Sequence, residues 1–309
     1  MIITVTLNPA IDVSYRVNNF ELGKGHRVEN GNKTAGGKGL NVSRVLKQLG
    51  AQPLCLGFLG GQNGEWIKNQ LKLDDLEQSF TTINKDTRTC LAFIDENQST
   101  QTELMEKGPV ITEEEKASFL YTYKQMFKKA KLIVSSGSLP LGMESSFYKE
   151  ISKLANEYNI PFLLDTSGES LKSGIEGSPF LIKPNQEELS QFAGKNLKAI
   201  DEMVEVAKEI CDQGVQHVLL SLGENGAVLV RKDIVLKADI PAIAVANPVG
   251  SGDSMIAGMA YSIYHNYSLK DSLKMACACG MANAMEKKTG FVQANIIKKL
   301  LSEIKITKI

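Results

Sequence analysis

Short runs of apolar residues alternate with segments of helical periodicity along most of the chain. The apolar runs predict strands over residues 2–7, 53–59, 132–135, 162–165, 180–182 and 217–221. Helical periodicity lies between them, over residues 40–46, 64–71, 144–158, 186–192 and 201–213. Continuous apolar strands separated by helices are typical of a parallel sheet that is covered on both faces. The pattern therefore predicts an α/β fold with a doubly wound, mostly parallel sheet, followed by helices over residues 254–265 and 269–287.

Two stretches break this alternation, at about residues 12–34 and 87–106. Polar and apolar residues alternate there in pairs of short segments, 13–17 with 27–30 and 87–93 with 100–105, which predicts half-exposed strands. Four such strands would form a small sheet with one apolar face to cover, either a lid over an active site or a surface that pairs with a second subunit. The alternative is an antiparallel extension of the main sheet. We found no repeat or linker, so residues 1–309 are predicted to form one domain with two lid insertions.

The charge balance excludes some classes of partner. The chain has 35 Lys and Arg residues against 35 Asp and Glu residues, so we expect no nucleic-acid or membrane partner, because such binding is driven by excess positive charge. The five cysteines are irregularly spaced, which favours reduced thiols. The N-terminus does not resemble a signal peptide, and no apolar run approaches the ~18 residues of a membrane span. These features predict a cytoplasmic protein.

A glycine-rich segment before the helix at 254–265 carries the first candidate chemistry. Gly250, Ser251 and Gly252 can gather backbone N–H groups at the positive end of the helix dipole, which forms an anion hole. Asp253 would repel a bound phosphate, but its position suits a base that takes the proton of a hydroxyl attacking phosphorus. The alternative is a plain helix cap.

A second glycine-rich segment, residues 34–41, also precedes a helix. It does not match a P-loop, but its glycines allow a close backbone approach to a ligand, and Lys38 offers a positive charge for phosphate. The alternative is a turn with a surface lysine. Arg27 and Arg88 lie on predicted lid strands, where they would either clamp a phosphorylated substrate or face solvent.

Two further motifs follow predicted strands. Asn185 and Glu188 have the spacing of a capping box, which is a sufficient structural explanation; orienting magnesium through water is the functional one. Ser221, Gly223 and Gly226 could bind nucleotide phosphate through backbone N–H groups or form a tight hairpin turn.

Together these motifs resemble the ribokinase-type carbohydrate kinases, the phosphofructokinase-B group. The resemblance spans essentially the whole chain, from Asn8-Pro9-Ala10-Ile11-Asp12 through the segment at 36–41 to the block at 250–253. The two glycine signatures occur in the order of the family, about 210 residues apart. The resemblance implies a ribokinase-like α/β domain with a β lid, ATP and Mg²⁺, and phosphoryl transfer to a sugar hydroxyl. Some members of the family also use K⁺.

The resemblance also implies roles for individual positions. For catalysis it implies Asp253 as base and the backbone of Gly250, Ser251 and Gly252 as anion hole. Substrate contacts are implied at Asp12, Arg27, Gly37, Lys38, Asn41, Arg88 and Ser138. ATP contacts are implied at Lys183, Asn185, Ser221, Gly223, Gly226 and Asn283, with Glu188 serving Mg²⁺ through water.

The branch of the family decides the expected substrate. Arg27, Lys38 and Arg88 suggest a sugar that already carries a phosphate. The segments 33–42 and 247–254 are similar to those of kinases that convert tagatose 6-phosphate to tagatose 1,6-bisphosphate, and kinases of fructose 1-phosphate share nearly all of them. We favour tagatose 6-phosphate, then fructose 1-phosphate; a 6-phosphofructokinase, a nucleoside kinase and a non-catalytic sugar-phosphate sensor rank lower. The expected partners are the sugar phosphate, ATP and a second copy of the chain, bound through the lid sheet.

Overall fold

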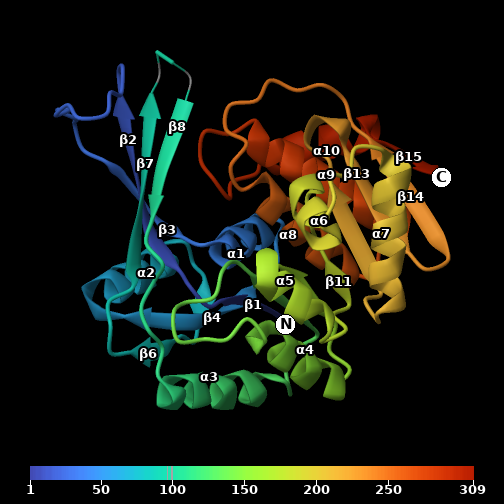
Figure 1. Ribbon diagram of the computed structural model, residues 1–309, viewed down its shortest axis with the longest axis horizontal. Coiled ribbons are helices and arrows are strands. Elements are labelled where there is room, and N and C mark those ends of the chain that lie inside the picture. Colours follow the sequence, from blue (N-terminus) through green and yellow to red (C-terminus); the bar gives the residue numbers. More distant parts are fainter. Residues whose placement is uncertain (96, 99) are drawn as a thin grey trace.

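A large twisted sheet runs through the molecule with helices on both sides (Figure 1). The computed structural model describes residues 1–95, 97–98 and 100–309. The strands of the large sheet are β1 (Ile2–Thr6), β4 (Pro53–Gly60), β5 (Glu77–Gln78), β6 (Thr81–Ile83), β9 (Leu132–Ser136), β10 (Phe162–Asp165), β11 (Leu181–Ile182), β12 (His217–Ser221), β13 (Ala227–Arg231), β14 (Ile234–Asp239) and β15 (Lys305–Lys308). Within the described residues their order is β15-β14-β13-β12-β11-β10-β9-β1-β4-β5, and β6 also pairs with β4.

The sheet is parallel from β12 to β5 and antiparallel at its other edge, from β12 to β15. Both faces of its central strands are buried. Along β9, Ile133 packs into one apolar core while its neighbours Leu132 and Val134 pack into the other, as the two-residue period of a strand requires. The predicted doubly wound, mostly parallel α/β sheet is therefore confirmed.

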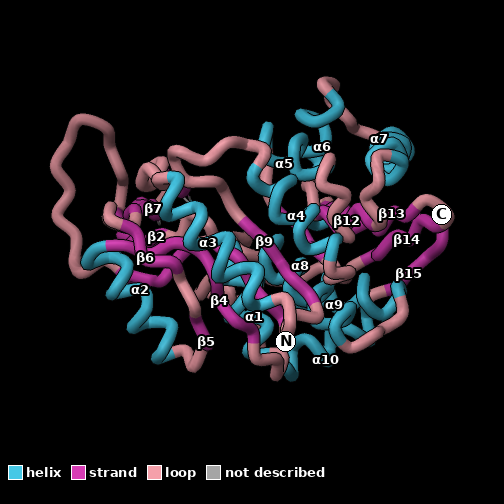
Figure 2. Tube along the Cα trace, turned by 90° about the horizontal axis from the view of Figure 1, so that it is seen from below, coloured by secondary structure: helices cyan, strands magenta, loops and turns pink. Residues whose placement is uncertain are grey.

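The helices that cover the large sheet divide between these two cores (Figure 2). One face is covered by α1 (Lys38–Gln48), α8 (Ser251–Tyr264), α9 (Leu269–Ala284) and α10 (Ala294–Glu303). The other is covered by α3 (Glu113–Met126), α4 (Phe147–Glu157), α5 (Gly168–Ile175), α6 (Gln186–Ala193) and α7 (Ile200–Asp212). None of the helices in the described ranges is long and apolar enough to cross a membrane.

A second, four-stranded sheet stands beside the large one (Figure 1). Its strands, in the order β3-β2-β7-β8, are β3 (Asn32–Gly36), β2 (Ala10–Val17), β7 (Arg88–Asp95) and β8 (Thr100–Met105). Its base packs on α2 (Gly61–Leu73), where Ile11 and Val13 join Ile67 and Leu71 in a small third core. The predicted separate sheet is thus present, rather than an extension of the main sheet. The predicted insertion 87–106 includes residues 96 and 99, which lie outside the described part of the chain.

One predicted strand of the second sheet is wrong. Residues 27–30 lie in an exposed loop, and the strand that pairs with β2 is β3, which begins at Asn32. In this pairing Gly36 lies opposite Ala10, so close to the Asp12 carboxylate that a side chain at position 36 would collide with it. Gly36 is the last residue of β3, which therefore ends just before α1. Arg27 therefore lies in a loop rather than on a strand.

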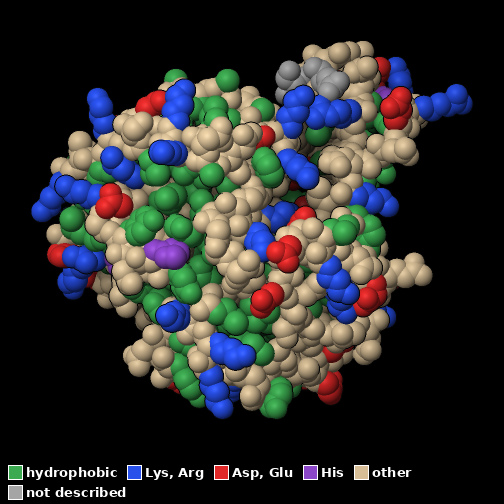
Figure 3. Space-filling view, turned by 180° about the vertical axis from the view of Figure 1, so that it is seen from behind, with side chains coloured by type: hydrophobic (Ala, Val, Ile, Leu, Met, Phe, Trp, Pro, Cys, Tyr) green, Lys and Arg blue, Asp and Glu red, His purple; other side chains and the backbone are tan. Residues whose placement is uncertain are grey.

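Surface charge agrees with the balanced composition. The back of the molecule shows lysine and arginine side chains scattered among acidic, polar and apolar ones, with no continuous basic stripe on that face (Figure 3).

Candidate active site

A cleft of about 1540 Å³ lies between the second sheet and the carboxyl ends of the parallel strands. Ligand sites of doubly wound sheets lie at this edge. The predicted site residues that line the cleft are Asp12, Arg27, Gly37, Lys38, Asn41, Arg88, Ser138, Lys183, Asn185, Glu188, Ser221, Gly250, Gly252 and Asp253. The structure therefore brings most of the predicted set together. Ser251, Gly223, Gly226 and Asn283 are not among the residues that line it.

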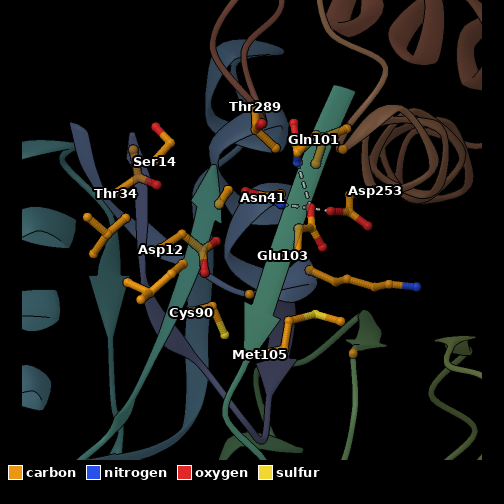
Figure 4. Close-up of a pocket in the computed structure, with 18 of the residues that line it drawn as sticks. Asp12, Ser14, Thr34, Asn41, Cys90, Gln101, Glu103, Met105, Asp253 and Thr289 are labelled. Atoms are coloured by element: carbon orange, nitrogen blue, oxygen red, sulfur yellow. Dashed lines mark hydrogen bonds between the residues drawn. The ribbon is translucent and has the colours of Figure 1, made fainter. Parts of the chain in front are cut away.

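Asp253 lies in the first turn of α8, buried on the floor of the cleft. Its Oδ2 accepts a hydrogen bond from Asn41 Nδ2 at 2.7 Å (Figure 4). Asn41 Oδ1 in turn accepts one from Arg44 Nη2 at 2.8 Å. The two contacts hold the carboxylate in one orientation. Burial raises the pKa of Asp253 to about 6, and the negative charge of Asp165 adds to this effect. A carboxylate with that pKa is poised to act as a base near neutral pH.

The turn before Asp253 requires glycine. Gly250 has φ of 81°, and a Cβ there would lie 2.5 Å from Thr289 Cγ2. A Cβ on Gly252 would lie 3.1 Å from Lys183 Nζ, so the ammonium group is close to the first turn of the helix. Ser251 N already donates to Pro248 O at 3.2 Å, so the N–H groups of the first turn that could hold an anion are those of Gly252 and Asp253, with the lysine beside them.

Asp165, which was not predicted, joins two of the predicted lysines. Its buried carboxylate lies 3.4 Å from Lys183 Nζ and 3.5 Å from Lys38 Nζ. Burial opposes the charge of Asp165, but the ammonium groups of Lys183 and Lys38 outweigh it and lower the pKa of Asp165, which in return raises the pKa of Lys38. The available signal was its place at the carboxyl end of β10, a buried parallel strand.

On the opposite wall, the two predicted lid residues Asp12 and Arg88 have different surroundings. Burial raises the pKa of Asp12 to about 6, although the positive charge of Arg88 opposes it. Arg88 donates from Nη1 to Glu106 O at 2.7 Å and from Nη2 to Asn8 O at 2.9 Å. Arg88 therefore ties the base of the second sheet to the chain after β8, which was not predicted.

Ser138 and Arg27 lie at two other parts of the wall. The hydroxyl of Ser138 accepts a hydrogen bond from Asn8 Nδ2 at 3.2 Å, in the loop after β9. Arg27 is exposed, in the loop before β3.

The predicted capping box is present at the start of α6. Asn185 Oδ1 accepts from Glu188 N at 2.8 Å, and Glu188 Oε2 accepts from Asn185 N at 2.9 Å. Both side chains also line the cleft, so capping does not remove them from it.

Three of the predicted ATP contacts, Gly223, Gly226 and Asn283, lie outside the cleft lining. Gly223 and Gly226 lie in the turn of the β12–β13 hairpin, which follows Ser221. Asn283 is fully buried: its Nδ2 donates to Val249 O at 2.8 Å, and its Oδ1 accepts from Gly290 N at 2.8 Å. Because the backbone occupies both ends of its amide, Asn283 fixes the loops on either side of the anion site and does not face the cleft.

Comparisons with known proteins agree with this architecture. A family model described as pfkB family carbohydrate kinase matches residues 5–295. Tagatose-6-phosphate kinase of Staphylococcus epidermidis is 39% identical over 314 residues, and the alignment covers 100% of both chains.

Solved structures show the same fold. Phosphofructokinase-2 from Escherichia coli, in complex with potassium, superposes with a TM-score of 0.92 at 26% identity and covers 97% of this chain and 98% of its own. A Thermotoga maritima protein described as a possible 1-phosphofructokinase superposes with a TM-score of 0.91 at 27% identity, covering 100% of this chain and 99% of its own.

Proposed function

The chain belongs to the pfkB family of carbohydrate kinases and is a sugar-phosphate kinase, and we propose that it transfers the γ-phosphoryl group of ATP to a hydroxyl of a ketohexose phosphate. The observation that supports this most is the geometry around Asp253. A carboxylate fixed by Asn41 lies at the N-terminus of α8, where the N–H of Gly252 lies in the first turn and a Cβ on Gly252 would lie 3.1 Å from Lys183 Nζ. A base and an anion site in one turn of helix suit phosphoryl transfer to an alcohol.

In the proposed reaction Asp253 takes the proton of the sugar hydroxyl. The hydroxyl oxygen forms a bond to the γ-phosphorus, the bond from that phosphorus to the bridging oxygen breaks, and ADP leaves with the electron pair. The N–H groups of Gly250, Gly252 and Asp253 and the ammonium of Lys183 stabilise the charge on the group in transfer, whereas Ser251 N already donates to Pro248 O at 3.2 Å. The carboxylate of Asp165 contacts the ammonium groups of Lys183 and Lys38, which holds Lys183 in place for this role.

Magnesium fits the nucleotide side of the cleft. The described residues hold no group of three or more His, Cys, Asp or Glu side chains that would form a metal cage. This suits Mg²⁺, which keeps several waters and takes one or two carboxylates together with substrate phosphates. Glu188, which lines the cleft, would hold it through water, and the ion would neutralise phosphate charge. A dependence on K⁺ belongs to the same proposal, because the related Escherichia coli structure contains potassium.

We favour tagatose 6-phosphate as the sugar, converted to tagatose 1,6-bisphosphate. The full-length similarity to a tagatose-6-phosphate kinase supports it, and the similarity to the Thermotoga protein keeps fructose 1-phosphate as the second candidate. Arg27 lines the cleft from an exposed loop, so its guanidinium is available for the phosphate that the sugar already carries.

A panel of substrates tests this choice. We expect kcat/KM with ATP to be about tenfold or more higher for tagatose 6-phosphate than for fructose 1-phosphate or fructose 6-phosphate, since one lost hydrogen bond to a charged group has about this effect. Unphosphorylated tagatose and a nucleoside serve as controls and should react far more slowly. A higher kcat/KM for fructose 1-phosphate would make that sugar the substrate instead of tagatose 6-phosphate. A higher kcat/KM for the nucleoside would contradict the proposed substrate class.

A homodimer through the second sheet is part of the proposal. The ring of Tyr15 on β2 stacks with Phe93 on β7, and Phe93 stacks with Phe20, so this sheet carries an aromatic cluster that is only partly buried in the single chain. A second subunit would cover it. A crystal structure of Escherichia coli phosphofructokinase-2 is described as a tetrameric inhibited form.

The pKa of Asp253 predicts how turnover depends on pH. Because its pKa is raised to about 6, the base is protonated below that pH, and kcat should fall as the pH decreases through 6. The hydrogen bond from Asn41 lowers the pKa of Asp253, so Asn41→Ala should move the fall to higher pH. Profiles of kcat against pH for the wild type and Asn41→Ala measure the two apparent pKa values. An unmoved profile would assign the fall to the substrate phosphate, which also titrates near pH 6.

A further inference from the structure

The cleft-facing side of the second sheet contains an acidic side chain that the motifs do not include. The strand register aligns side chains in two rows across β2, β7 and β8: Asp12–Cys90–Met105 and Ser14–Ala92–Glu103. Side chains two residues apart on a strand share a face, so Glu103 lies on the same face as Asp12, and both line the cleft.

The carboxylate of Glu103 is accessible to a ligand in the cleft. Gln101 Nε2 donates to Glu103 Oε1 at 2.6 Å, which orients the carboxylate. Within the described ranges no lysine or arginine forms an ion pair with it, and the side chain is exposed to the cleft. Its neighbour on β7 is Ala92, which is too small to cover it.

Three carboxylates therefore point into one part of the cleft, those of Asp12, Glu103 and Asp253 (Figure 4). Asp12 is within electrostatic range of the other two: burial raises its pKa most, the charges of Arg88 and Arg44 oppose this, and those of Glu103 and Asp253 add to it. An anion beside Glu103 is repelled by its carboxylate, whereas a hydroxyl can donate a hydrogen bond to it. This end of the cleft suits the hydroxyl-bearing end of a sugar phosphate.

We propose that Glu103 is a specificity-determining residue, which accepts a hydrogen bond from a sugar hydroxyl and disfavours a phosphate at the same place. The inference rests on the proposed function, because it assumes a sugar monophosphate with its free hydroxyl at this end. The product is affected as well: once the hydroxyl has become a phosphate, the charge of Glu103 opposes binding of the bisphosphate and favours its release.

Calorimetric binding of two ligands tests the inference without relying on turnover. The ligands are tagatose 6-phosphate and fructose 1,6-bisphosphate, and the proteins are the wild type, Glu103→Gln and the control Glu21→Gln. Glu21 is an exposed residue near the end of β2 that pairs with Lys24 and does not line the cleft, so its substitution makes the same change in net charge. In Glu103→Gln we expect the Kd of the monophosphate to rise about tenfold and that of the bisphosphate to fall about threefold or more.

Opposite shifts for the two ligands would support the inference, since general damage to the cleft weakens both. Equal weakening of both ligands, or values that match the wild type and Glu21→Gln, would overturn it. If the wild type binds tagatose 6-phosphate without phosphorylating it, the proposed function fails and the Glu103 comparison still stands. If the wild type binds neither ligand, the inference fails together with the proposed function.

Discussion

Replacing Asp253 with asparagine is expected to lower kcat by about 10²–10⁴-fold, the usual contribution of a general base. The amide has nearly the same shape and can still accept the hydrogen bond from Asn41, so the geometry of the first turn of α8 is preserved. What is lost is the ability to take the proton of the attacking hydroxyl. Steady-state kinetics with ATP and the sugar phosphate measure kcat, and calorimetry should show ATP binding close to that of the wild type.

The matched control is Asp271→Asn. Asp271 occupies the third position of α9, the same place that Asp253 has in α8, but it is exposed and interacts with the capping residue Ser268. If Asp253 only interacted with the helix N-terminus and took no proton, Asp253→Asn and Asp271→Asn would have similar, small effects on kcat. Full turnover in Asp253→Asn would refute its role as base.

Replacing Asp165 with asparagine is expected to lower the free energy of unfolding by about 3–5 kcal/mol, because it leaves the buried ammonium of Lys183 without its carboxylate. Turnover should fall as well, since the substitution also releases Lys38 from the cleft floor. Urea unfolding measures the stability. Asp233→Asn is the control: it removes an exposed ion pair with Arg231 and should cost about 0–1 kcal/mol.

The pH dependence of this effect has a definite sign. The folded-state pKa of Asp165 lies below its ordinary value of 3.8, so its stabilising contribution is present above pH 3.8 and is lost as the pH falls further. The difference in stability between wild type and Asp165→Asn should therefore narrow in acid. A difference below 1 kcal/mol at neutral pH would contradict the proposed role of Asp165.

The central sheet could be predicted from the sequence because its strands are buried on both faces. The run of β4 is apolar along its length and β12 has an apolar centre, and both are as short as strands and flanked by helical segments. The edge strand β15 could not be predicted, because its lysines and partly exposed positions match a loop equally well and only pairing with β14 makes it a strand. The helix α3 was missed for a similar reason: it buries few side chains, among them Phe119 and Tyr123, on an otherwise polar segment.

The site was predictable where its residues are adjacent in sequence. The glycines before Asp253 are informative by themselves, since a turn into a helix N-terminus is local. Asp165 is marked only by its place at the carboxyl end of β10, and its lysine partners come from other elements. Nothing in the sequence around Glu103 marks it, and strand pairing places it on the face of Asp12. The hydrogen bonds that Arg88 donates to two backbone carbonyls likewise depend on the fold and cannot be predicted from the sequence around it.

The most direct measurement of the proposed function is the identity of the product. The wild type is incubated with ATP, Mg²⁺ and tagatose 6-phosphate, and the mixture is followed by phosphorus NMR. We predict a new sugar phosphomonoester resonance that grows in step with ADP, with no inorganic phosphate beyond the enzyme-free control, and neither change with Asp253→Asn. Release of inorganic phosphate from ATP without a new ester, or no consumption of ATP with any of the three ketohexose phosphates, would contradict it.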